Sequence, residues 1–106
     1  MNSNQKGKVG EREFAKVCRE HGYEARRSQQ YCGANGDADV IGLPGIHIEV
    51  KRVERLNIEG AMSQSKADAK TVIPIVAHRK NHCEWLITMT AEDWFNFYRE
   101  WEVSQS

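Results

Sequence analysis

Several residue types and patterns are scarce in this chain, and their scarcity excludes several classes of protein. Three cysteines occur among its 106 residues, at unrelated spacings without a CxxC pair, which argues against a disulfide framework and against structural zinc. No apolar run is long enough to cross a membrane, and the polar N-terminal residues lack the apolar core of a signal peptide. We therefore expect a cytoplasmic protein with no membrane partner.

Net charge is also absent, because 15 lysines and arginines balance 15 aspartates and glutamates. A nucleic-acid-binding domain is usually basic, so this balance argues against that function. The two signs are nevertheless unevenly distributed. Basic residues outnumber acidic ones up to residue 30, whereas the chain beyond Lys80 is acidic. A dipolar molecule of this kind can present one basic face to phosphate groups, with moderate and salt-sensitive affinity.

Length and composition indicate one folded domain. Hydrophobic residues make up 40% and charged residues 28% of the chain, as in ordinary globular proteins. Neither an internal repeat nor a linker rich in Pro, Gly or Ser divides the chain. We expect a single domain over residues 1–106, in which residues 1–7 are flexible and residues 102–106 form a tail.

Residues 37–53 carry the pattern of a β-hairpin. Alternation of apolar and polar residues predicts strands over 37–43 and 46–53. Leu43-Pro44-Gly45 supplies the turn that lets the second strand fold back on the first. Because successive side chains of a strand point to opposite faces, the polar residues of the second strand share one face.

Four polar side chains gather on this hairpin. His47, Glu49 and Lys51 share the face just described, and across the turn Asp39 lies near Glu49. Two carboxylates and an ammonium in a small volume are unfavourable unless a divalent cation lies between the carboxylates. These oxygen ligands suit Mg²⁺ or Mn²⁺ bound jointly with phosphate and water, and a lysine can orient the water. The alternative is a solvated face with a weak Glu49–Lys51 ion pair.

Two motifs resemble those of a known group of nucleases. Asp39-Val40-Ile41 followed by Ile48-Glu49-Val50-Lys51 resembles the PD-(D/E)XK motif, and the run from Lys6 to Phe14 resembles the start of archaeal-type and phage Holliday junction resolvases. In that family a glycine precedes a Glu-Arg pair that opens the first helix, as in Gly10-Glu11-Arg12 here. The likeness covers residues 1–60 and, beyond them, only the order of the elements.

The resemblance implies a catalytic set and a DNA-binding set. The residues carried over as catalytic are Glu11, Asp39, Glu49 and Lys51. Of these, Glu11, Asp39 and Glu49 would hold one or two Mg²⁺ or Mn²⁺ ions. The residues expected to contact DNA are Lys8, Arg12, Arg26, Arg27 and Gln64. Gln64 is a candidate by resemblance alone, and its alternative is a solvated helix face.

The chain departs from the motif at the position of its proline, which is Ala38 here. Asp37 also adds a second acid on the same strand face, two positions before Asp39. Either aspartate could therefore be the metal ligand. The hydrophobic pair that follows Asp39 matches the register of the family and favours Asp39.

The remaining periodicities complete an α/β fold. Helices are expected over 9–21, 59–70 and 91–101, and further strands over 23–28, 71–78 and 83–89. Together with the hairpin, these elements give the order α-β-β-β-α-β-β-α. As the resemblance implies, this is a restriction-endonuclease-like fold in which a central mixed β-sheet is flanked by helices.

The last predicted helix carries an aromatic stripe of Trp94, Phe97, Tyr98 and Trp101. Acidic rather than basic residues accompany the stripe, which disfavours stacking on nucleic acid. So many large aromatic residues exceed what one small core hides, so we expect core packing for part of the stripe and a homodimer contact for the rest. A twofold dimer places two active sites at a fixed separation, as paired nicks in a four-way junction require.

The expected function is that of a metal-dependent DNA endonuclease, most specifically a Holliday junction resolvase acting on branched DNA. Two alternatives stay open. One is another PD-(D/E)XK nuclease, which nicks flaps or single strands during phage or mobile-element replication. The other is a non-catalytic DNA-binding module whose D…ExK pattern is accidental. The protein comes from a phage, a bacterium or an archaeon, and a phage protein would act in the cytoplasm of the infected cell.

Overall fold

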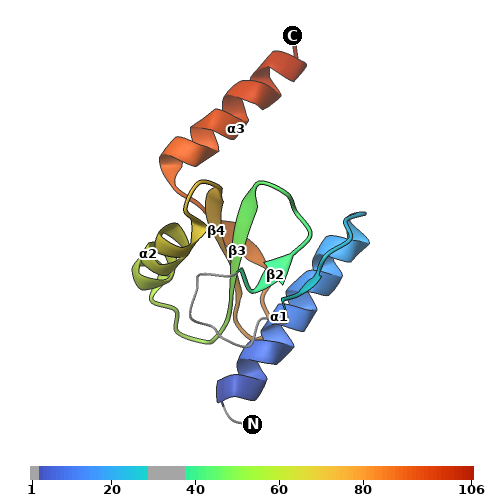
Figure 1. Cartoon of the computed structure of the whole chain (residues 1–106), viewed down its shortest axis with the longest axis vertical. Coiled ribbons are helices and arrows are strands. Elements are labelled where there is room, and N and C mark those ends of the chain that lie inside the picture. The colour runs from blue at the N-terminus through green and yellow to red at the C-terminus, as the bar shows by residue number, and fades with distance from the viewer. Residues whose placement is uncertain (1–2, 29–37) are drawn as a thin grey trace.

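The computed structural model describes residues 3–28 and 38–106, with side chains described from Gly7 onward within these ranges. Asp37, the alternative acidic ligand, lies outside the described residues. Over the described part the elements follow the predicted order, α-β-β-β-α-β-β-α (Figure 1). They are α1 (Ser3–Glu20), β1 (Arg26–Arg27), β2 (Val40–Ile41), β3 (Ile46–Arg52), α2 (Ile58–Ala69), β4 (Ile73–Arg79), β5 (Leu86–Thr88) and α3 (Ala91–Ser104).

The terminal helices are longer than the periodicity predicts. α1 begins at Ser3 rather than Val9 and so includes residues that were expected to be flexible. The glutamine and lysines in this stretch favour a helix even without an apolar stripe. α3 continues to Ser104 and takes in most of the predicted tail. The predicted stop of α1 is confirmed, since Gly22 follows it with a φ of 97° that suits glycine. None of the described helices combines the length and apolarity needed to cross a membrane.

The strands of the described residues form one five-stranded mixed sheet in the order β1-β2-β3-β4-β5. β3 and β4 are parallel and are connected through α2, whereas the other neighbouring strands are antiparallel. β1, β2 and β5 are shorter than the predicted strands over 23–28, 37–43 and 83–89. The alternating pattern indicates extended chain, but ladder pairing extends only over the shorter stretches.

α1 and α2 cover opposite faces of the sheet (Figure 1). On the α1 side, Phe14 packs in a core cluster with Ile48 of β3 and Ile75 of β4. On the other side, the buried residues of α2 are small, and the hydroxyl of Ser65 donates a 2.9 Å hydrogen bond to the carbonyl of Ile75. Because both faces are covered, the polar face of β3 lies beneath α2 instead of facing solvent.

α3 extends away from the sheet and from the other two helices (Figure 1). None of its residues is buried, and its aromatic side chains are between 39% exposed, at Tyr98, and 56% exposed, at Trp101. The expectation that part of the stripe packs in the core of this chain is therefore wrong. The helix carries the stripe past the end of the sheet, where the described residues form no layer to cover it.

Candidate metal centre

Asp39 lies immediately before β2. Val40 pairs with Ile48 across the β2–β3 ladder, which brings the preceding residue, Asp39, close to Glu49. The backbone N–H of Asp39 donates to the carbonyl of Ile48 over 2.8 Å. Its Oδ2 accepts a 2.9 Å hydrogen bond from the backbone N–H of Val50. The predicted proximity of Asp39 and Glu49 is confirmed, and the backbone of β3 fixes the direction of the Asp39 carboxylate.

Glu49 occupies the polar face of β3, and its side chain is 4% exposed. Burial is the largest cause that raises the pKa of Glu49, to about 8. The charge of Asp39, a hydrogen bond with Asp39 and the charge of Asp68 raise this pKa further, whereas Lys51 lowers it. The ammonium of Lys51 thus does not compensate for burial beside two other carboxylates. An ionised Glu49 is costly here because it is buried beside two other carboxylates, and a bound cation would offset that cost.

Glu11 approaches Asp39 from α1. The helix passes close to β3 at Gly10, where an added Cβ would lie 2.6 Å from the Cβ of Arg52. Oε1 of Glu11 accepts a 2.8 Å hydrogen bond from Nε of Arg27. Burial and then the charge of Asp39 raise the pKa of Glu11, against the opposing effect of Arg27. The charge of Asp39 therefore raises the pKa of both Glu11 and Glu49.

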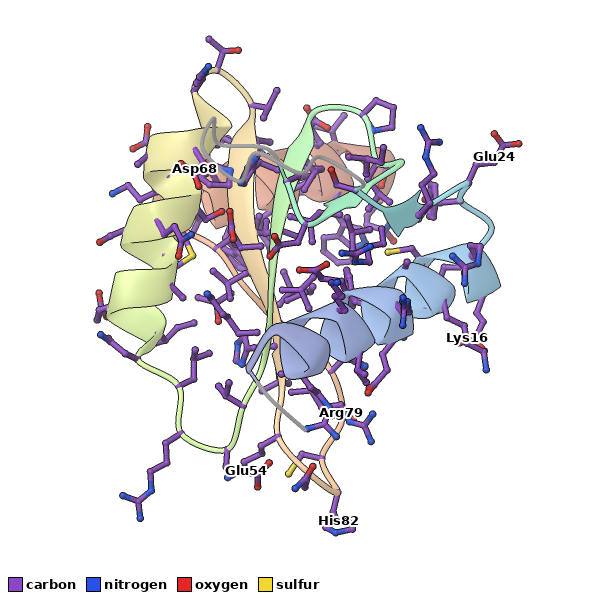
Figure 2. All side chains as sticks on the ribbon, turned by 60° about the horizontal axis from the view of Figure 1, so that its bottom comes forward. Lys16, Glu24, Glu54, Asp68, Arg79 and His82 are labelled. Atoms are coloured by element: carbon purple, nitrogen blue, oxygen red, sulfur yellow. The ribbon has the colours of Figure 1, made fainter. Side chains whose placement is uncertain are left out.

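His47 and Asp68 complete the surroundings of Glu49. Nε2 of His47 lies 2.9 Å from Oε1 of Glu49, and potential ligand atoms of all three residues lie within 4.8 Å of one another. Asp68 belongs to α2 and lies on the side of that helix that faces the sheet (Figure 2). The sequence places His47 on the polar face, but it does not single out Asp68. The available signal was helical spacing, since Asp68 follows the buried Ser65 by three positions.

This arrangement of elements has a counterpart among solved structures. Hjc, a Holliday junction resolvase from the archaeal hyperthermophile Archaeoglobus fulgidus, matches with a TM-score of 0.60 over 79% of this chain and 72% of that chain. The fold is that of Hjc. At 21% sequence identity, the likeness shows the fold alone, and it confirms the predicted α/β fold with a central mixed sheet flanked by helices. No family model and no curated protein matches the sequence.

Within the Hjc-like fold, the residues expected to contact DNA have different surroundings. Lys8, Arg12 and Arg26 are exposed along α1 and β1, and Gln64 is exposed on α2. Arg27 is half-buried, and its guanidinium is bound to Glu11. Arg27 thus forms an ion pair with Glu11, a carboxylate of the candidate site, and its guanidinium is not free for DNA alone.

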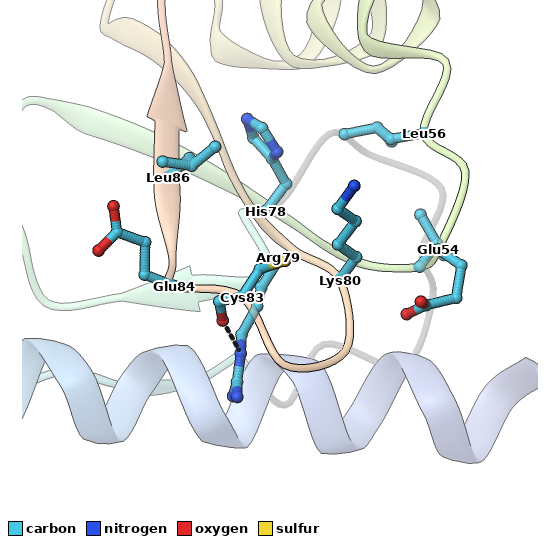
Figure 3. Close-up of a pocket in the computed structure, with 9 residues that line it drawn as sticks. Glu54, Leu56, His78, Arg79, Lys80, Cys83, Glu84 and Leu86 are labelled. Carbon is cyan, nitrogen blue, oxygen red and sulfur yellow. Dashed lines mark hydrogen bonds between the residues drawn. The ribbon is translucent and has the colours of Figure 1, made fainter.

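A separate cavity of about 400 Å³ lies at the carboxyl ends of β3 and β4 (Figure 3). Nε of Arg79 donates to the carbonyl of Cys83 across one side of it. Nε2 of His78 lies 2.8 Å from the hydroxyl of Thr88, and burial lowers the pKa of this histidine. The lining includes none of the acids near Glu49, so this cavity is not part of the candidate centre.

Proposed function

We propose that this protein is a metal-dependent endonuclease that hydrolyses phosphodiester bonds in branched DNA, most specifically in four-way junctions. The observation that carries the proposal is the meeting of Asp39 and Glu49 beside Lys51, in a fold shared with a Holliday junction resolvase. We further propose that it acts in the cytoplasm, or in the host cytoplasm if a phage encodes it.

The residues present fit a divalent cation such as Mg²⁺ or Mn²⁺. Glu11, Asp39 and Glu49 offer hard carboxylate oxygens. Burial and then the charge of Asp39 raise the pKa values of Glu11 and Glu49, so their ionised forms are costly without a cation. These three acids would hold the cation. When bound, it supplies Lewis-acid stabilisation of the charge that develops on the phosphate.

The other residues position the reactants. Lys51 lies on the same strand face as Glu49, where its ammonium can orient the attacking water and stabilise charge on phosphorus. The N–H of Val50 holds the Asp39 carboxylate, and Arg27 holds that of Glu11. Exposed basic residues, Arg12 among them, bind the phosphate backbone and set its register. Contacts to phosphate make binding salt-sensitive, and because the formal net charge is +0, we expect the affinity to be moderate.

The proposal includes a homodimer formed through α3. An apolar cavity of about 490 Å³ lies between α1, β5 and α3, and Phe14, Trp85, Ile87 and Phe97 are among the residues that line it. The exposed aromatic residues of α3 continue from Phe97 along the helix. An aromatic helix and an unfilled apolar cavity on one chain are complementary, so a twofold pair can place α3 of each copy against the cavity of the other. Two active sites at a fixed separation suit paired nicks in a junction.

The proposed function predicts cleavage that depends on Glu49 and Lys51. Labelled four-way junction, linear duplex, flap and single strand are incubated with Mg²⁺, Mn²⁺ or EDTA. We expect paired nicks in the junction that EDTA abolishes and that Glu49→Gln or Lys51→Ala reduces by at least about 100-fold. Glu59→Gln changes an exposed acid of α2 and serves as the matched control, with cleavage unchanged.

Each outcome of this experiment has a distinct meaning. Metal-dependent cutting of flaps or single strands instead of the junction would support the nuclease activity and contradict the preference for four-way junctions. No cutting by folded wild-type protein would reject the nuclease and favour a DNA-binding module. Loss of the fold in Glu49→Gln, measured by circular dichroism, would assign Glu49 a structural role.

A further inference from the structure

The structure places two potential metal ligands beside Glu49. They are the imidazole of His47, on the same strand, and the carboxylate of Asp68, on α2. We propose that His47 and Asp68 bind the divalent cation together with Glu49, and that the imidazole makes the site prefer a first-row transition-metal ion such as Mn²⁺ over Mg²⁺. The inference rests on the proposed function insofar as it shares Glu49 with the proposed nuclease site. It adds two ligands and the class of metal.

The distances match a coordination shell. His47 and Glu49 alternate with Ile48 on β3, so both side chains leave the strand on the same face. Their ligand atoms are 2.9 Å apart, and two ligands at right angles with bonds of about 2.1 Å lie about 3.0 Å apart. One carboxylate oxygen of Asp68 lies within 4.8 Å of a potential ligand atom of each of these two residues, a limit that admits the separation of about 4.2 Å between opposite ligands of an octahedron.

Burial and charge make the group costly without a cation. The side chains of His47 and Glu49 are 5% and 4% exposed, and ionisable groups at this depth need compensating partners. Their mutual contact does not balance the site, because Asp39 and Asp68 bring further carboxylates near Glu49, against the ammonium of Lys51. With Glu49 ionised, three carboxylates face one ammonium and one imidazole. A dication at the centre offsets the charge of the carboxylates.

α2 is held firmly enough to place the third ligand. Ser65, three positions before Asp68, is 0% exposed and donates its hydroxyl to the carbonyl of Ile75. The alanines on the same side, Ala61 and Ala69, are also buried against the sheet. Asp68 therefore projects from a helix that is fixed on both sides of it, which limits the reorganisation that metal binding requires.

The imidazole carries the prediction of selectivity. Mg²⁺ prefers oxygen ligands and keeps much of its water shell. An imidazole nitrogen adds affinity for the later first-row ions, and that affinity rises from Mn²⁺ toward Cu²⁺. A site formed by carboxylates alone discriminates less against Mg²⁺. His47 should therefore determine the ratio of the two affinities, whereas Asp68 should contribute to both.

The inference is tested by metal binding without DNA. Free Mn²⁺ gives a six-line EPR spectrum that is lost on binding, and Mg²⁺ is titrated against it as competitor. We expect wild-type protein to bind Mn²⁺ at least about tenfold more tightly than Mg²⁺. His47→Gln should weaken Mn²⁺ at least about tenfold and Mg²⁺ much less, and Asp68→Asn should weaken both.

Matched variants and a second readout keep this test independent of folding. His82→Gln and Glu59→Gln change an exposed histidine and an exposed acid, and both should bind metal as wild type does. Pulsed EPR of Mn²⁺ bound to wild-type protein should show coupling to an imidazole ¹⁴N. This readout needs no substitution, so the folding of a variant does not affect it. Absence of that coupling, or an unchanged Mn²⁺/Mg²⁺ ratio in folded His47→Gln, overturns the proposal.

Failure of this inference and failure of the proposed function give different results. The inference alone is rejected if junction cleavage depends on Glu49 but metal binding is unchanged in His47→Gln and Asp68→Asn. Mn²⁺ binding that depends on His47, without cleavage of any DNA, supports the inference and rejects the nuclease.

Discussion

Glu49 is a buried acid whose ionisation works against folding. Burial and the neighbouring Asp39 raise its pKa from 4.5 to about 8. Because the folded-state pKa is the higher one, the fold favours the protonated form. This stabilisation is fully present below pH 4.5 and is lost as the pH rises towards 8. A bound dication stabilises the carboxylate and should reverse the loss.

This residue therefore predicts a pH dependence of stability. In EDTA, the Tm of wild-type protein should fall more between about pH 5.5 and pH 8.5 than that of Glu49→Gln, because glutamine has no proton to release. Thermal unfolding followed by circular dichroism measures both. Glu59→Gln should keep the wild-type pH dependence. Parallel curves for wild type and Glu49→Gln would contradict the raised pKa.

At the scale of elements, the features that could be predicted from sequence depend on local contacts. Thr90 caps α3 by accepting a 3.1 Å hydrogen bond from the N–H of Asp93, and Asn57 caps α2 through Gly60 in the same way. The hairpin that joins Asp39 to Glu49 is set by a short turn and by alternation. Each of these signals lies within a few residues of its effect.

The contacts that escaped prediction join distant elements. Asp68 reaches Glu49 only because α2 crosses the sheet at a particular angle, and the weak amphipathic pattern of that helix does not specify the angle. Arg27 pairs with Glu11 because α1 lies beside β1, so a residue expected to bind DNA proves to hold an acid of the candidate site. Periodicity predicts which side of an element is buried, but not what it meets there.

The docking of α1 on β3 predicts opposite effects at two glycines of one helix. An alanine Cβ at Gly10 would lie 2.6 Å from the Cβ of Arg52, whereas nothing lies within 4 Å at Gly7. Gly10→Ala should lower the free energy of unfolding by about 1–3 kcal/mol because α1 must move off the sheet. Gly7→Ala should raise it by up to about 1 kcal/mol through helix propensity. Urea denaturation measures both, and equal effects would contradict the close approach.

At the scale of the whole molecule, α3 makes the chain elongated, with extents of 50 × 29 × 27 Å. Its rings hold one another in place. Trp94 stacks on Tyr98 at 5.4 Å between centroids, and Tyr98 contacts Trp101 at 5.7 Å. A preordered row of exposed aromatic residues loses little side-chain entropy on association. Such a row is characteristic of a surface that contacts another molecule rather than water.

The homodimer predicts a change of oligomeric state that leaves the metal centre intact. Sedimentation equilibrium should show a dimer for wild type and a monomer for the double variant Phe97→Glu/Trp101→Glu, because charge replaces apolar contact on α3. Val72→Glu, at another exposed apolar position, should remain a dimer. The monomer should still bind Mn²⁺, since β3 and α2 supply those ligands, but its nicks in a four-way junction should no longer be paired. A monomeric wild type that makes paired nicks would show that the pairing does not depend on α3.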